Sequence, residues 1–74
     1  MANHKTEKEK SQITSRELQV LRLIADGHTS AMIAEILCIT VNTVHNHRVR
    51  IFEKLDAHNV ASMLKAARQK GVIS

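Results

Sequence analysis

Residues 29–55 read TSAMIAEILCITVNTVHNHRVRIFEKL, and this stretch decides the fold. Two hydroxyl residues in it, Thr29 and Thr40, are suited to cap helices, and each precedes apolar residues at helical spacing. The spacing predicts a short helix over 30–37 and a longer one over 41–55, joined by a turn at Cys38-Ile39. A short helix, a tight turn and a longer capped helix are typical of a helix-turn-helix.

The predicted helix over 41–55 has an apolar stripe and a polar stripe. Side chains follow one another at about 100° around a helix, which places Val44, Ile51 and Leu55 on one side. The opposite side fits the width of the B-DNA major groove, where asparagine pairs with adenine and an aliphatic group contacts the thymine methyl. Four residues on that side are predicted to contact bases: Asn42, His45, Asn46 and Val49.

Two kinds of residue are predicted to contact DNA phosphates. Free backbone N–H groups at a helix N-terminus bind phosphate, and hydroxyl side chains beside them cap the helix as well. Long cationic side chains on the flanks of the helix over 41–55 supply the opposite charge. The predicted phosphate contacts are Thr29, Ser30, Thr40, Thr43, Arg48, Arg50 and Lys54.

Two further helices complete an all-α, four-helix domain. Thr14 and Glu17 form the capping-box pattern T-x-x-E, which starts a helix over about 15–26 that ends before a glycine. Asn59 caps a last helix over about 60–70. We therefore predict a domain over residues 13–74. Residues 1–12 read MANHKTEKEKSQ and are predicted to be a disordered tail or linker, because they lack a repeating apolar face.

Composition excludes several classes of function. A chain of 74 residues has room for one small domain, and a formal charge of +4 is consistent with a polyanionic partner. Phe52 is the only aromatic residue, which counts against binding single strands by base stacking. Cys38 is the only cysteine and the histidines lack ligand spacing, so we expect no metal and no cofactor.

No arrangement of residues in this sequence is typical of an enzyme. There is no glycine-rich phosphate loop, no pair of carboxylates on one helix face, and no nucleophile with a base. No apolar run approaches the length of a membrane span, and the N-terminal residues of this sequence lack the apolar core of a signal peptide. We therefore expect a cytoplasmic protein that is associated with the nucleoid when it is bound to DNA.

The motifs from residue 13 onward, taken in order, resemble the LuxR/GerE family of bacterial DNA-binding domains. The family pattern begins with an aliphatic residue and T-x-R-E, followed by an apolar helix that ends in a glycine. An I-A pair and an apolar-hydroxyl pair come next. The third helix then reads T-V-x-x-H and I-x-x-K-L. The matching residues are Ile13, Thr14, Arg16, Glu17, Gly27, Ile33, Ala34, Ile39, Thr40, Thr43, Val44, His47, Ile51, Lys54 and Leu55.

The resemblance implies a transcription regulator whose third helix enters the major groove of double-stranded DNA. It also implies a homodimer formed through the fourth helix, and a sensor or receiver domain N-terminal to the DNA-binding domain. RNA polymerase is a further expected partner. The sequence departs from the family at His45, where lysine is common, at Arg50, where asparagine is frequent, and at Met32, where glutamate is common. Val60 and Ser62 replace the usual arginine and glutamate of the fourth helix.

Two other functions fit a helix-turn-helix. The first is region 4 of a sigma factor, although the capped helix after Asn59 argues against it. The second is a degenerate helix-turn-helix that serves as a protein–protein interaction module, which the changes at His45 and Met32 favour. Salt-dependent binding to duplex DNA separates the interaction module from a DNA-binding domain.

Overall fold

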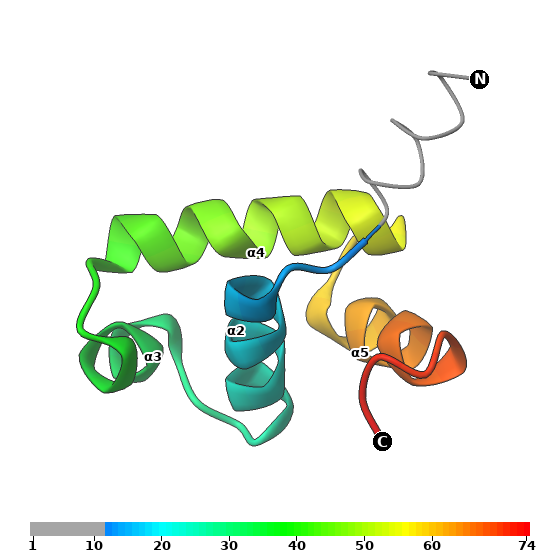
Figure 1. Cartoon of the computed structure of the whole chain (residues 1–74), viewed down its shortest axis with the longest axis horizontal. Coiled ribbons are helices and arrows are strands. Elements are labelled where there is room, and N and C mark those ends of the chain that lie inside the picture. Colours follow the sequence, from blue (N-terminus) through cyan, green and yellow to red (C-terminus); the bar gives the residue numbers. More distant parts are fainter. Residues whose placement is uncertain (1–11) are drawn as a thin grey trace.

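The computed structural model describes residues 12–74, and this part of the chain is all-α. Its helices are α2 (Ser15–Ala25), α3 (Ser30–Leu37), α4 (Val41–Leu55) and α5 (Val60–Gln69). Helix α4 is the longest and packs against each of the other three (Figure 1). The predicted fold class and the four predicted helices are confirmed. The predicted tail lies outside the described residues, except for Gln12.

Each helix begins where a side chain accepts a hydrogen bond from a free backbone N–H. Thr14 and Glu17 form the predicted capping box, in which the Glu17 N–H donates to Thr14 Oγ1 at 3.1 Å and the Thr14 N–H donates to Glu17 Oε1 at 3.0 Å. Thr29 and Thr40 cap α3 and α4, as predicted. Such caps satisfy donors that a helix leaves unpaired at its start.

The start of α5 carries a second capping box, of which only the Asn59 cap was predicted. The Ser62 N–H donates to Asn59 Oδ1 at 2.8 Å, and the Asn59 N–H donates to Ser62 Oγ at 3.3 Å. Ser62 stands where the LuxR/GerE family usually has glutamate. Its hydroxyl takes the place of the glutamate carboxylate in the box, so α5 keeps both capping hydrogen bonds.

In residues 12–74, all four helix ends are followed by a residue with positive φ, at Gly27, Cys38, Asp56 and Gly71. Gly27 has φ +94 and follows α2 as predicted, because glycine adopts positive φ without a steric cost. Cys38 has φ +57 at the end of α3, where no glycine is available. The Ile39 N–H donates to the Ala34 carbonyl at 3.0 Å and closes this turn.

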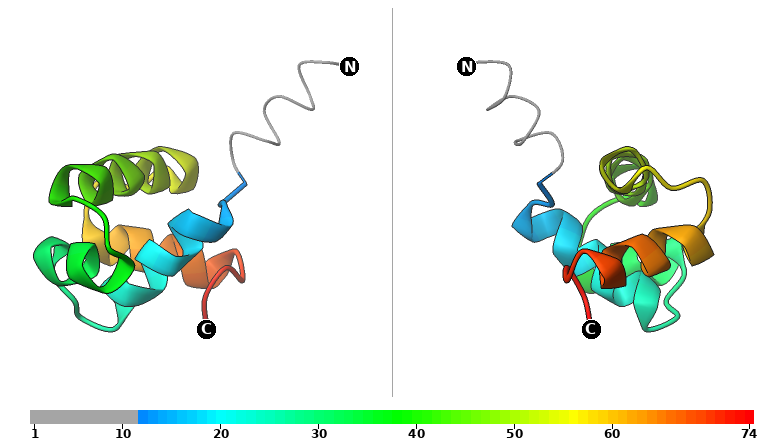
Figure 2. Two further views of the ribbon diagram at one scale, coloured as in Figure 1. Left: turned by 60° about the vertical axis from the view of Figure 1, so that its left-hand side comes forward. Right: turned by 90° about the vertical axis from the view of Figure 1, so that its right-hand side faces the viewer.

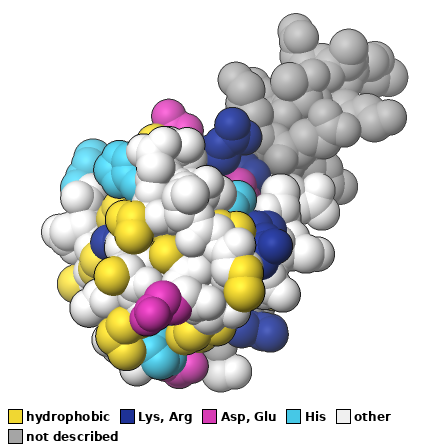
Figure 3. Space-filling model, turned by 90° about the vertical axis from the view of Figure 1, so that its left-hand side faces the viewer, with side chains coloured by type: hydrophobic (Ala, Val, Ile, Leu, Met, Phe, Trp, Pro, Cys, Tyr) yellow, Lys and Arg dark blue, Asp and Glu magenta, His cyan; other side chains and the backbone are white. Residues whose placement is uncertain are grey.

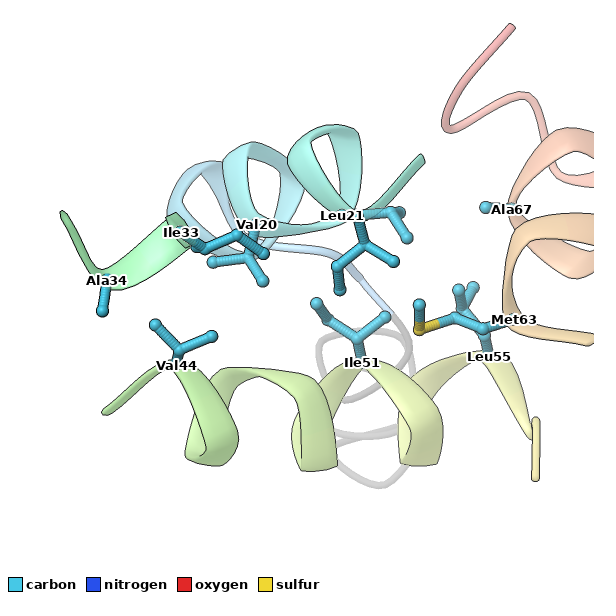
Figure 4. Packing of buried hydrophobic residues seen from close by; sticks show 10 residues of the cluster. Val20, Leu21, Ile33, Ala34, Val44, Ile51, Leu55, Met63 and Ala67 are labelled. Atoms are coloured by element: carbon cyan, nitrogen blue, oxygen red, sulfur yellow. The ribbon is translucent and has the colours of Figure 1, made fainter. Parts of the chain in front are cut away.

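The core lies between α4 and the other three helices (Figure 4). Val44 faces Ile33 and Ala34 at one end of α4, and Leu55 faces Met63 at the other end. Figure 2 shows from two further directions that α4 lies on one side of the molecule and α2, α3 and α5 on the other. No helix in residues 12–74 combines the length and the apolar character that crossing a bilayer requires.

Truncating the central core residue of α4 should destabilise the domain far more than truncating an exposed one. Ile51 is fully buried, so Ile51→Ala should lower the free energy of unfolding by about 3 kcal/mol through lost burial and the cavity left behind. Val49 lies on the same helix and is 41% exposed, so Val49→Ala should change the free energy of unfolding by less than about 0.5 kcal/mol. Urea unfolding followed by circular dichroism measures both, since the chain has no Trp or Tyr.

If Ile51→Ala does not fold at all, Ile51→Val provides the same test at a smaller cost of about 1 kcal/mol. Equal effects of the Ile51 and Val49 variants would contradict the assigned core.

Candidate nucleic-acid interface

Helices α3 and α4 form the predicted helix-turn-helix. Helix α3 ends at Leu37, residues 38–40 form the turn, and α4 starts at Val41. Two buried residues of α3, Ile33 and Ala34, hold it against α4. Because both helices are fixed by the core, the first turns of α4 project at one end of the molecule (Figure 1).

The side chains predicted to contact bases lie together on the outer side of α4. Asn42, His45, Asn46 and Val49 are all exposed, whereas Val44 on the opposite side is fully buried. Figure 3 shows the end of the molecule that carries α3 and the start of α4. Histidine side chains lie at its upper left and near its lower edge, and most of the visible Lys and Arg side chains lie along its right-hand edge. Hydrophobic side chains occupy much of this face, and an acidic side chain lies among them in its lower part.

The hydroxyl residues at the start of α4 have defined local partners. Thr40 Oγ1 accepts from the Thr43 N–H at 3.1 Å, and the two threonine hydroxyls lie 2.9 Å apart, within hydrogen-bond distance. Thr29 Oγ1 accepts from the Met32 N–H at 3.2 Å at the start of α3, and Ser30 next to it is half-buried. These are caps in the structure, and a capped N-terminus still directs its remaining N–H groups outward.

The three predicted cationic contacts differ in their surroundings. Arg50 is exposed on the flank of α4, and Arg48 is half-buried. Neither guanidinium has an ion-pair partner within residues 12–74. Lys54 differs from both, because its ammonium group lies 2.7 Å from Glu17 Oε1.

The Lys54–Glu17 pair ties the end of α4 to the start of α2. The side chain of Lys54 is 16% exposed and that of Glu17 is 3% exposed, so the pair is largely removed from water. Glu17 Oε1 also accepts from the Thr14 N–H in the capping box. The structure therefore gives Lys54, one of the predicted phosphate contacts, an internal structural partner.

The pKa of Glu17 reflects this environment. Burial of the carboxyl raises its pKa, but hydrogen bonds from Lys54 and Thr14 and the charge of Lys54 lower it further than burial raises it. The net result is a pKa below the ordinary value of 4.5. Glu17 is thus ionised at neutral pH and holds the Lys54 ammonium group in place.

The histidines of the described residues, 12–74, are not gathered with other possible metal ligands. His45 is exposed and His47 is half-buried, two positions apart on one helix. Within residues 12–74, no three His, Cys, Asp or Glu side chains gather as metal ligands would. The half-buried His28 has a buried Nδ1 without a hydrogen-bond partner in the described structure, for which we have no physical account.

Comparison with known proteins decides the family. Residues 11–67 match the family described as "Bacterial regulatory proteins, luxR family". The chain belongs to this family. This LuxR-family chain is similar to YgeK of Escherichia coli K12, described as an uncharacterized response regulatory protein, with 44% identity over 84% of the chain and 42% of that protein. It is also 38% identical to the transcriptional regulatory protein DesR of Bacillus subtilis 168, over 85% of the chain and 32% of that protein.

A solved structure shows the same fold within a longer regulator. The response regulator ChrA of a heme-sensing two-component system matches with a TM-score of 0.80 and 32% identity, over 84% of this chain and 31% of that one. The LuxR-family chain thus spans less than half of the length of these relatives. It carries the helix-turn-helix domain of a family of transcription regulators.

Removing the charge of Glu17 should change how stability depends on pH. The lowered pKa of Glu17 stabilises the folded state above the ordinary value of 4.5, and this stability is lost as pH falls through the lower folded value. Glu17→Gln should therefore cost about 1–2 kcal/mol at pH 7 and progressively less as pH falls below the ordinary value. Thermal or urea unfolding at several pH values measures this.

Glu35→Gln is the matched control, because Glu35 is an exposed glutamate of α3 with no ion pair in the described structure. The unfolding free energy of Glu35→Gln should equal that of the unsubstituted protein at every pH. A Glu17→Gln difference that does not shrink toward low pH would refute the assigned ion pair.

Proposed function

We propose that this domain binds double-stranded DNA sequence-specifically, as part of a bacterial transcription regulator, with α4 in the major groove. The observation that carries the proposal is the two-sided character of α4. One side is anchored in the core by Val44, Ile51 and Leu55, and the other presents exposed polar side chains at the projecting end. A helix fixed in this way fits the major groove by its width.

Base contacts are assigned to the exposed face of α4. Asn42 and Asn46 present amides, which donate and accept at once, and His45 presents an imidazole. Val49 presents a methyl surface in the same face. These four side chains occupy consecutive turns, so they reach base edges together if α4 lies in the groove.

Phosphate contacts are assigned to the borders of this face. The N-termini of α3 and α4 supply backbone N–H groups beside Thr29, Ser30, Thr40 and Thr43. Arg48 and Arg50 supply charge. Lys54 is left out of this set because its ammonium group is paired with Glu17. A formal charge of +4 over the chain supports attraction to a polyanion.

The proposed organisation of the whole regulator follows the family. Residues 13–74 form the DNA-binding domain, and a sensor or receiver domain precedes it in the full-length protein, as the greater length of the relatives supports. Two copies associate through α5, whose exposed side includes Ala61, Lys65 and Arg68. The regulator acts on chromosomal DNA in the bacterial cytoplasm and works with RNA polymerase, and it has no enzymatic role.

A protein–protein interaction module is the second candidate. Met32 and Ile36 on α3 and Val41 at the start of α4 are large aliphatic side chains that are between 43% and 51% exposed. Exposed aliphatic groups at one end of a domain favour contact with another protein. A sigma-factor region is supported less, because α5 continues the domain beyond α4 and packs on it.

A duplex DNA of mixed sequence, titrated into the isotope-labelled chain, should shift NMR signals of residues 40–50. The shifts should be present at about 50 mM salt and fade steeply by about 200 mM, because bound phosphates release counterions. No shifts at the lower salt concentration would reject DNA binding and leave the interaction module as the function.

Substituting one arginine should distinguish a phosphate contact from a general effect of charge. Arg50→Ala should weaken binding to all duplexes and reduce the slope of log affinity against log salt by about 1. Arg22→Ala removes the same charge from an exposed site in the last turn of α2 and should leave that slope unchanged. Fluorescence anisotropy of a labelled duplex measures both, and equal slopes for the two variants would contradict the assigned contact.

A further inference from the structure

The exposed surface of the first turns of α4 carries no lysine or arginine. Between residues 41 and 49 the exposed side chains are two valines, two asparagines and one histidine, namely Val41, Asn42, His45, Asn46 and Val49. The only Lys or Arg between residues 41 and 49 is Arg48, which is half-buried, and Arg50 follows after the span. The face that would meet base edges is therefore neutral.

The missing cations restrict which bases this surface can read. Guanine offers two acceptors in the major groove, N7 and O6, and proteins read it with the paired donors of arginine or with lysine. Adenine offers one acceptor and one donor, which match the carbonyl and NH₂ of an asparagine amide. Thymine offers a methyl group, which favours an aliphatic neighbour. Asparagine and valine are thus the side chains suited to A·T pairs.

His45 does not replace arginine or lysine as a bidentate donor to guanine. The two nitrogens of an imidazole lie on opposite sides of its ring, so the side chain cannot donate to N7 and O6 of one guanine at the same time. A single donor gives less discrimination than a bidentate pair. The composition of this face therefore selects against dependence on guanine.

The spacing of these side chains matches the spacing of base pairs. Asn42 and Asn46 are four residues apart, which is a rise of about 6 Å along α4, close to two base steps of about 3.4 Å each. Val49 lies about 4.5 Å farther along the same side. Val49 is 41% exposed, so contact with a methyl group would remove apolar surface that now faces water.

We propose that α4 reads an A·T-rich half-site, in which Asn42 and Asn46 hydrogen-bond to adenines and Val49 packs against a thymine methyl. This inference rests on the proposed function, because it requires α4 to lie in the major groove. Beyond that function, it specifies A·T pairs as the bases contacted and Asn42, Asn46 and Val49 as the side chains that select them.

The first experiment is a selection of duplexes from a random-sequence pool by the 74-residue chain at about 50 mM salt. The expected result is enrichment of a short A·T-rich core over the starting pool. Enrichment of a core with obligatory guanines on both strands would overturn the inference and leave the proposed function intact. No retention of any duplex would reject both.

The second experiment alters single atoms of the selected duplex. Replacing an adenine by 7-deazaadenine removes the N7 acceptor, and replacing a thymine by deoxyuridine removes the methyl group. Each should weaken binding of the unsubstituted protein, by at least about fivefold for the adenine change. Asn46→Ala should abolish the sensitivity to one deazaadenine, and Val49→Ala should abolish the sensitivity to one deoxyuridine.

Matched controls isolate the contacts. Gln69→Ala removes an exposed amide from the end of α5, and Ile36→Ala truncates an exposed aliphatic side chain of α3. Both should retain the full sensitivity to the modified bases. An A·T-rich selected core that binds equally well with either modified base would mean that DNA shape is read instead, and would overturn the inference.

Discussion

The burial of one side of α4 is the constraint on which the rest of the domain depends. Val44, Ile51 and Leu55 lie along that side, and each of the other helices contributes buried residues that face it. A small chain has too little apolar surface for independent layers, so one helix has to serve as the common partner of the rest. This arrangement leaves the other side of α4 uncovered along its length.

The uncovered side owes its rigidity to contacts made elsewhere. Residues of α3 hold the start of α4, while the Glu17–Lys54 ion pair and the contacts of α5 hold its end. Because both ends are fixed, the backbone positions of Asn42 and Asn46 are set before any ligand arrives. A backbone placed in advance loses less conformational entropy on binding, which favours specificity over adaptability.

Much of this fold was predictable because its signals are local in the sequence. Thr14, Thr29, Thr40 and Asn59 each cap a helix within a few residues, and the helical period separates buried from exposed positions on α4. The role of Lys54 was not predictable in the same way. Its partner Glu17 lies 37 residues away, and the period of one helix contains no information about the side chains of another.

The sequence predicts which residues of α4 form its exposed surface, but it does not predict which DNA atoms they contact. Helical spacing identifies which residues of α4 are exposed, whereas the atom that each one contacts depends equally on the DNA. The capping role of Ser62 was missed for another reason. A hydroxyl closes a capping box less often than a carboxylate, so the pattern N-x-x-S is a weaker signal than T-x-x-E.

The left-handed turn at Cys38 has a practical consequence. Cys38 carries the only thiol in these 74 residues, and its side chain is exposed two residues before the cap of α4. A fluorescent or spin-labelled reporter attached to this sulfur would sit beside the projecting end of α4 without displacing a buried side chain. The turn therefore supplies a ready point from which distances to any bound molecule can be measured by spectroscopy in the unaltered sequence.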